Sequence, residues 1–117
     1  MRNSFQKIGI ALSVVLGMAT FSSFANNENR VSVTNLHIDN GQNGIPYIAG
    51  DARNNTTQTL KSVFIKFNLY QGDALVGNAI DTIQDLGARE IYKIQAPTNP
   101  FLYKFDSYKV TSIEIYE

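Results

Sequence analysis

The stretch LKSVFIKFNLY, residues 60–70, is the most regular part of the sequence. Its apolar side chains recur at every second position from Val63 through Ile65, Phe67 and Leu69. Successive side chains of an extended strand point to opposite faces, so a period of two is typical of a β-strand with one buried face. The stretch therefore predicts a strand that places these four residues in the core.

The same two-residue period continues on both sides of this stretch, and no sustained helical period occurs. We expect further strands at residues 31–38, 47–54, 75–83, 88–95 and 108–116, separated by turn-forming segments at 39–44, 54–59 and 72–73. Tyr108 and Val110 are out of phase with Ile113 and Ile115, which predicts a β-bulge near Thr111. About six or seven short strands with a turn about every 8–12 residues indicate an all-β, two-sheet antiparallel sandwich.

Three motifs along the chain resemble those of a known family. GDARN at residues 50–54 matches a strand end of the form G-x-small-x-N, FNLY follows at 67–70, and LG at 86–87 precedes Tyr92 and Ile94. Over residues 31–117 the chain resembles the FxLYD domain, an exported bacterial module. The resemblance implies an immunoglobulin-like sandwich and brings no catalytic residues. The chain departs from the family pattern at Gln71, where Asp is usual, and at Leu86, where Pro is usual.

Residues 1–25 have the three zones of a cleavable signal peptide. Arg2 and Lys7 supply positive charge, residues 8–21 are mostly apolar, and Ser23 and Ala25 are the small residues that a signal peptidase requires. The apolar zone is shorter than the roughly 20 residues that span a bilayer. We therefore expect a periplasmic or secreted protein with no membrane segment after cleavage. Residues 26–30 are polar and are predicted to form a disordered lead to the domain at 31–117.

The composition excludes several classes of function. Once Arg2 and Lys7 are removed, eight basic residues face ten acidic ones, and this net charge near −2 argues against binding to nucleic acid. The mature chain has one His, no Cys and no Met, so we expect neither a cofactor nor a transition-metal site. DNGQNG at 39–44 lacks the full ligand set of a calcium loop, because Gly41 and Gly50 stand where the pattern needs an oxygen ligand and a bidentate Glu, and it is predicted to be a hairpin turn. With no G-x-S-x-G motif and no distinctive pair of carboxylates, we expect no enzyme activity and no catalytic residues.

The candidate binding site lies on the solvent side of the strand at 60–70. There Phe64 and Tyr70 flank Lys66 and Asn68, a pattern typical of a small protein-binding or self-association patch. The alternative, which the sequence leaves open, is that the two rings only stabilise the fold. In that case residues 97–105 cover Phe64, and Tyr70 packs at a sheet edge. We interpret the protein as a non-enzymatic interaction module with an unidentified protein partner or a second copy of itself.

An alternative function is a carbohydrate- or peptide-binding module that uses the aromatic segment beginning at Phe101 and ending at Tyr108. The competing interpretation of that segment is that its aromatic side chains fill the core, because a small domain without Trp needs large apolar side chains inside.

Cleavage after Ala25 should leave Asn26 as the new N-terminus, because small residues occupy the positions before the cut. The measurement is the intact mass of protein recovered from the cell envelope or medium. A folded, membrane-bound protein that retains Met1 would show instead that the segment is an anchor.

Overall fold

The computed structural model describes residues 29–99, 102 and 104–117. The predicted signal peptide lies outside these residues. Six antiparallel strands form two three-stranded sheets that pack together, so the predicted β-sandwich is confirmed. No helix within the described ranges is long and apolar enough to cross a membrane.

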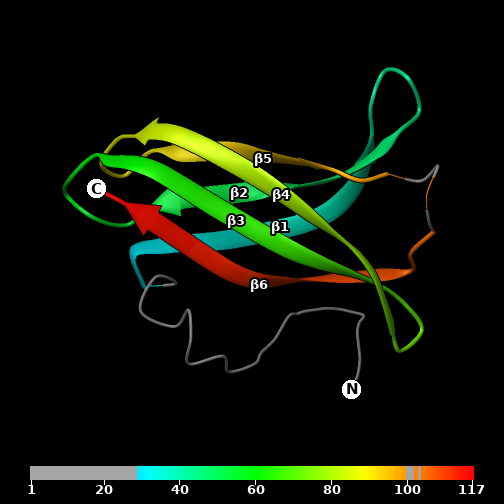
Figure 1. Cartoon of the computed structure of the whole chain (residues 1–117). Helices are drawn as coiled ribbons and strands as arrows, with labels where there is room; N and C mark the ends of the chain where they lie inside the picture. Colours follow the sequence, from blue (N-terminus) through cyan, green and yellow to red (C-terminus); the bar gives the residue numbers. More distant parts are fainter. Residues whose placement is uncertain (1–28, 100–101, 103) are drawn as a thin grey trace.

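The first sheet has the order β1-β2-β5 and the second the order β4-β3-β6. Figure 1 shows the two sheets as layers, with β3 in the middle of one and β2 in the middle of the other. The strands are β1 (Val31–Asn40), β2 (Pro46–Asn54), β3 (Leu60–Gln71), β4 (Ala74–Leu86), β5 (Ile91–Pro97) and β6 (Ser107–Tyr116). Three connections carry the chain from one sheet to the other, at residues 55–59, 87–90 and 98–106.

The core is the layer of apolar side chains between the sheets. Val63, Ile65, Phe67 and Leu69 of β3 are all fully buried, as the alternation in their sequence predicted. They meet residues from every other strand, namely Val31, Ile48, Ala52, Ala79, Ile83, Leu86, Ile94, Ala96 and Ile113.

The bulge expected in the last strand is present. Phe67 pairs with Val110 and Lys66 with Ser112, so Thr111 is the extra residue on β6. This extra residue reverses the alternation, which lets Val110 and Ile113 both face the core although they are three positions apart.

Some strand ends differ from those predicted. β1 continues through Asp39 and Asn40, because these residues pair with Tyr47 and Pro46 before the chain turns at 41–45. β5 begins at Ile91, because the preceding residues form a tight turn. β5 then extends to Pro97, two residues beyond the predicted strand end at residue 95. Proline lacks an N–H group, and it is tolerated here at the last position of an edge strand.

The two sides of the sandwich, where edge strands of different sheets meet, are held by polar contacts. On one side Asp81 of β4 accepts a hydrogen bond at 2.8 Å from the backbone N–H of Gln95 on β5. On the other side Arg30 forms an ion pair with Glu117. The carbonyl of Arg30 also accepts the N–H of Asn55 at 2.8 Å. Arg30, which the sequence placed in the disordered lead, is therefore attached to the domain.

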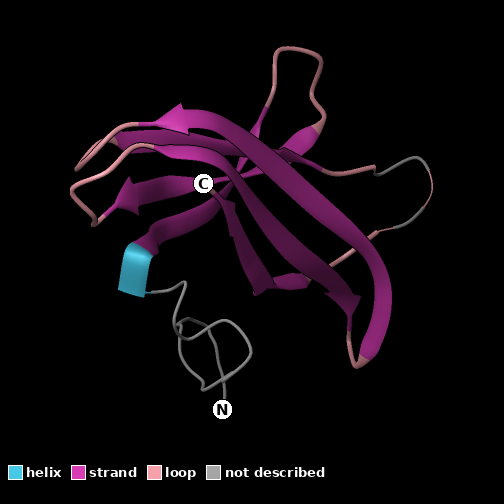
Figure 2. Cartoon of the chain, turned by 60° about the vertical axis from the view of Figure 1, so that its left-hand side comes forward, coloured by secondary structure: helices cyan, strands magenta, loops and turns pink. Residues whose placement is uncertain are grey.

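A buried asparagine joins two of the connections between the sheets. Asn54 ends β2 and is fully buried. Its Nδ2 donates to the carbonyls of Leu86 and Gly87 at 2.9 Å each and to that of Gln58 at 2.8 Å. Its Oδ1 accepts the N–H and the hydroxyl of Thr56 at 2.8 and 2.7 Å. One side chain thus links the 55–59 connection to the end of β4, and Figure 2 shows both connections at the same end of the molecule.

Replacing Phe67 with Ala should lower the free energy of unfolding by about 3–5 kcal/mol, because it leaves a cavity between the sheets. The measurement is chemical denaturation of the mature domain. The matched control is Lys66→Ala on the exposed side of the same strand, which should change the stability by no more than about 0.5 kcal/mol. Equal denaturation midpoints for the two variants would contradict this account of β3.

Candidate functional site

The four residues predicted as a candidate binding site lie on β3, the middle strand of its sheet. Phe64, Lys66, Asn68 and Tyr70 alternate with the core residues and therefore point away from the other sheet. Lys66 is exposed and the other three are half-buried. Because β4 and β6 flank β3 on both sides, Tyr70 does not lie at a sheet edge.

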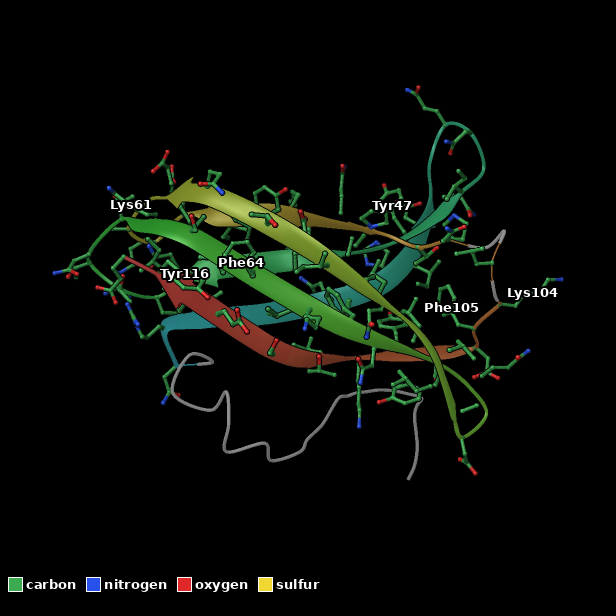
Figure 3. The ribbon with its side chains drawn as sticks, viewed as in Figure 1. Tyr47, Lys61, Phe64, Lys104, Phe105 and Tyr116 are labelled. Carbon is green, nitrogen blue, oxygen red and sulfur yellow. The ribbon has the colours of Figure 1, made fainter. Side chains whose placement is uncertain are left out.

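An apolar cluster crosses this sheet around Phe64. The Phe64 ring contacts the Tyr116 ring edge-on, with centroids 5.5 Å apart and planes at 81°, and Figure 3 shows the two side chains next to each other. On β4, Ile80 pairs with Lys66 and so lies diagonally across from Phe64. Ile80 is 46% exposed and Tyr116 55% exposed. One residue from each strand therefore contributes apolar surface to this cluster.

The rest of the same surface is polar, and hydrogen bonds hold its side chains in place. Asn78 donates to Asn68 at 2.7 Å, and Asn68 donates to the Tyr70 hydroxyl at 3.2 Å. The ammonium group of Lys109 lies 5.5 Å from the centroid of the Tyr70 ring. We use the term β3 face for the surface formed by Phe64, Lys66, Asn68, Tyr70, Ile80 and Tyr116.

The aromatic segment near the C-terminus contributes to the core at two described positions. Phe105 packs against the core cluster, and the Tyr108 ring meets Phe67 edge-on at a centroid distance of 6.5 Å. Burial raises the pKa of Tyr108 to about 12. Leu102 is 77% exposed, while Phe101 and Tyr103 lie outside the described residues.

The segment predicted to be a hairpin turn forms one, at residues 41–45. Asn43 Oδ1 accepts the N–H of Ile45 at 3.0 Å, and Gly44 has a positive φ of 78°. Asp39 Oδ1 accepts the N–H of Asn40 at 2.9 Å. Within the described ranges, no group of three or more His, Cys, Asp and Glu side chains is placed to hold a metal ion.

A second surface feature lies on the outer side of the β1-β2-β5 sheet. It is a hollow of about 360 Å³ lined by residues of all three strands, most of them polar. The residues that line it are Asn35, His37, Asp39, Tyr47, Ala49, Gly50, Asp51, Lys93, Ile94 and Gln95.

Sequence reasoning did not find this hollow, and it did not add Ile80 or Tyr116 to the β3 face. Both surfaces depend on which residues lie opposite one another on neighbouring strands, and the pattern along a single strand does not contain that information. One signal was present. β2 contains the small residues Ala49, Gly50 and Ala52, which are typical of close approach by a neighbouring backbone. A Cβ on Gly50 would lie 2.9 Å from the carbonyl oxygen of Thr34.

No family model, no curated protein and no solved structure matches this chain.

Proposed function

We propose that this protein is a non-catalytic, exported protein-interaction module that binds a protein partner or a second copy of itself through the β3 face. The observation that carries the proposal is the cluster of Phe64, Ile80 and Tyr116, which presents apolar surface from three adjacent strands. Polar residues with restrained side chains surround the cluster. Protein-binding surfaces commonly have this composition, with aromatic residues at the centre and a polar rim.

Two features favour the β3 face over other exposed surfaces. Its backbone belongs to the central strand of a sheet, so a partner would meet a surface that changes little on binding. Asn68, Asn78 and Tyr70 already bond to one another, which lowers the side-chain entropy that binding would cost.

The family and the location are part of the same proposal. In the motif that resembles the FxLYD family, Gly50 allows β1 to approach closely and Asn54 connects the two sheets. A two-sheet sandwich needs a small residue where strands approach closely and a polar side chain where its connections meet. The positions of Gly50 and Asn54 therefore support an immunoglobulin-like sandwich of the FxLYD kind. The three zones of residues 1–25 support export to the periplasm or beyond. The single His and the absence of Cys support a non-catalytic role.

Carbohydrate or peptide binding by the segment from Phe101 to Tyr108 is the alternative proposal, and it has less support. Phe105 and Tyr108 pack against the core and offer little ring surface to a ligand. A glycan screen of the mature domain distinguishes the two proposals.

The double variant Phe64→Ser, Tyr70→Ser should stay folded but lose its partner or its dimer. The loss of the edge contact between Phe64 and Tyr116 should cost about 0.5–1.5 kcal/mol of stability. The measurements are thermal unfolding, sedimentation for self-association, and cross-linking in cells from a photoreactive residue at the exposed position 82, which pairs with Phe64 on β3. The matched control is Arg53→Ser, an exposed change on the other sheet.

Each result has a defined meaning for the proposal. A cross-linked species that forms with the parent and with Arg53→Ser, but not with the double variant, supports it. A species that forms equally with all three proteins, or no species and no dimer for the parent, contradicts it. Unfolding of the double variant would mean that the two rings serve stability instead.

A further inference from the structure

The hollow on the β1-β2-β5 sheet has a small residue at its centre. Ala49 of β2 pairs with His37 on β1 and with Gln95 on β5. Tyr47 and Asp51 are the next residues of β2 on the same outer side. Four larger polar side chains thus surround an alanine, and the difference in size leaves the hollow.

A β-bulge turns His37 toward this hollow. Between Thr34 and His37 the register of β1 against β2 shifts by one extra residue. Asn35 has a positive φ of 58°, which is uncommon for a residue other than Gly. The extra residue turns Leu36 toward the core, where it packs against the buried cluster, and returns His37 to the outer side. Without it, alternation from Thr34 would point His37 inward.

Gly50 permits this arrangement. A Cβ at position 50 would lie 2.8 Å from Cδ2 of Leu36 and 2.9 Å from the carbonyl oxygen of Thr34, closer than real contacts allow. A left-handed Asn, a bulge and a glycine therefore occur together at the hollow. Strained backbone of this kind is typical of functional sites, where it orients a side chain.

One carboxylate of the hollow is already neutralised. Asp51 accepts hydrogen bonds from Lys93 Nζ at 2.7 Å and from Asn35 Nδ2 at 2.8 Å. The hydrogen bond from Lys93, followed by that from Asn35, lowers the pKa of Asp51 below its ordinary value. Both of its oxygens are therefore occupied, and this pair contributes little net charge to the hollow.

Two other groups of the hollow, His37 and Asp39, present acceptors. His37 Nδ1 lies 2.7 Å from the carbonyl of Asn35, and a carbonyl can only accept, so Nδ1 carries the proton. In the neutral ring Nε2 is then an acceptor. Asp39 forms no ion pair with a Lys or Arg in the described part of the chain, and its Oδ2 receives only a long hydrogen bond of 3.4 Å from the Tyr47 hydroxyl.

From these groups we infer that the hollow binds a cationic nitrogen group, a guanidinium or an ammonium. Such a group carries several N–H donors and no acceptor, which matches the acceptors on Asp39 and on Nε2 of His37. Asp39 would receive a charge-assisted hydrogen bond, His37 Nε2 would accept a second, and the half-buried Tyr47 ring can contact the cation through its face. This function is separate from the proposed role of the β3 face, which lies on the other sheet.

The cation could belong to a basic side chain of a protein or to a free polyamine, and the test includes a probe for each. The probes are Nα-acetyl-arginine N-methylamide and spermidine, with the neutral citrulline analogue of the first as a control. Each is titrated into the ¹⁵N-labelled mature domain, and amide chemical shifts are recorded. We expect saturable shifts at Tyr47, Ala49 and Gln95 with at least one cationic probe, weakened by added salt because the attraction is electrostatic.

Two variants locate the binding. Asp39→Asn keeps the size of the side chain but removes its charge and should weaken binding about tenfold or more. Ala49→Ile should fill the hollow and abolish the shifts, and a β-branched side chain is favourable in a strand. The matched control is Asp73→Asn, which removes one charge at the exposed turn between β3 and β4 and should leave the affinity unchanged.

The proposal is overturned if neither cationic probe gives saturable shifts, or if the citrulline analogue gives shifts as large as those of the cationic probe that binds. It is also overturned if the shifts map elsewhere, or if Asp39→Asn and Asp73→Asn bind that probe alike. A stronger response to capped arginine would identify a protein side chain as the source of the cation. A stronger response to spermidine would identify a small free cation. None of these outcomes depends on whether the β3 face binds a partner.

Discussion

The two sheets are joined where the Asn54 side chain bonds to both of the connections that meet at one end of the sandwich. An amide is the one kind of small side chain that can do this. It donates two hydrogens to the carbonyls around Leu86 and Gly87 and accepts from Thr56 at the same time. The bond to the Leu86 carbonyl is buried and those to Gly87 and Thr56 are partly buried. A buried backbone group costs about 1–3 kcal/mol if it is left without a partner. The chain has no Cys, so hydrogen bonds and the core hold the sheets together without a disulfide.

Because the core and this junction hold the sheets together, the two outer faces can differ in chemistry. The β3 face is apolar and aromatic around Phe64, while the hollow around Ala49 is mostly polar. The two surfaces are on opposite sides of the sandwich, since they belong to different sheets (Figure 1). A module of this kind would have two independent contact surfaces that do not compete for the same residues.

The strands and the buried residues of β3 were predictable because a period of two is a local property of the chain. The phase change in the last strand also located the bulge at Thr111. The two surfaces were less predictable, because Ile80 and Tyr116 join Phe64 only through the pairing of strands. No change of phase in the sequence indicated the bulge at Asn35, because a single polar residue within a strand does not predict a left-handed backbone conformation. The local sequence pattern therefore predicted the two sheets and the core between them. The composition of the two surfaces depends on the register between neighbouring strands, which that pattern does not contain.

The most direct test of this account is the stability of Asn54→Asp compared with Asn55→Asp, the same change one residue later. At position 54 the carboxylate would face three carbonyl oxygens in a buried place, and the free energy of unfolding should fall by about 3–5 kcal/mol at neutral pH. Burial raises the pKa of the new acid, so this penalty should be largest well above that pKa and should shrink as the pH falls. Asn55→Asp should change the stability by no more than about 0.5 kcal/mol. Equal stabilities for the two variants across the pH range would contradict the central role given to Asn54.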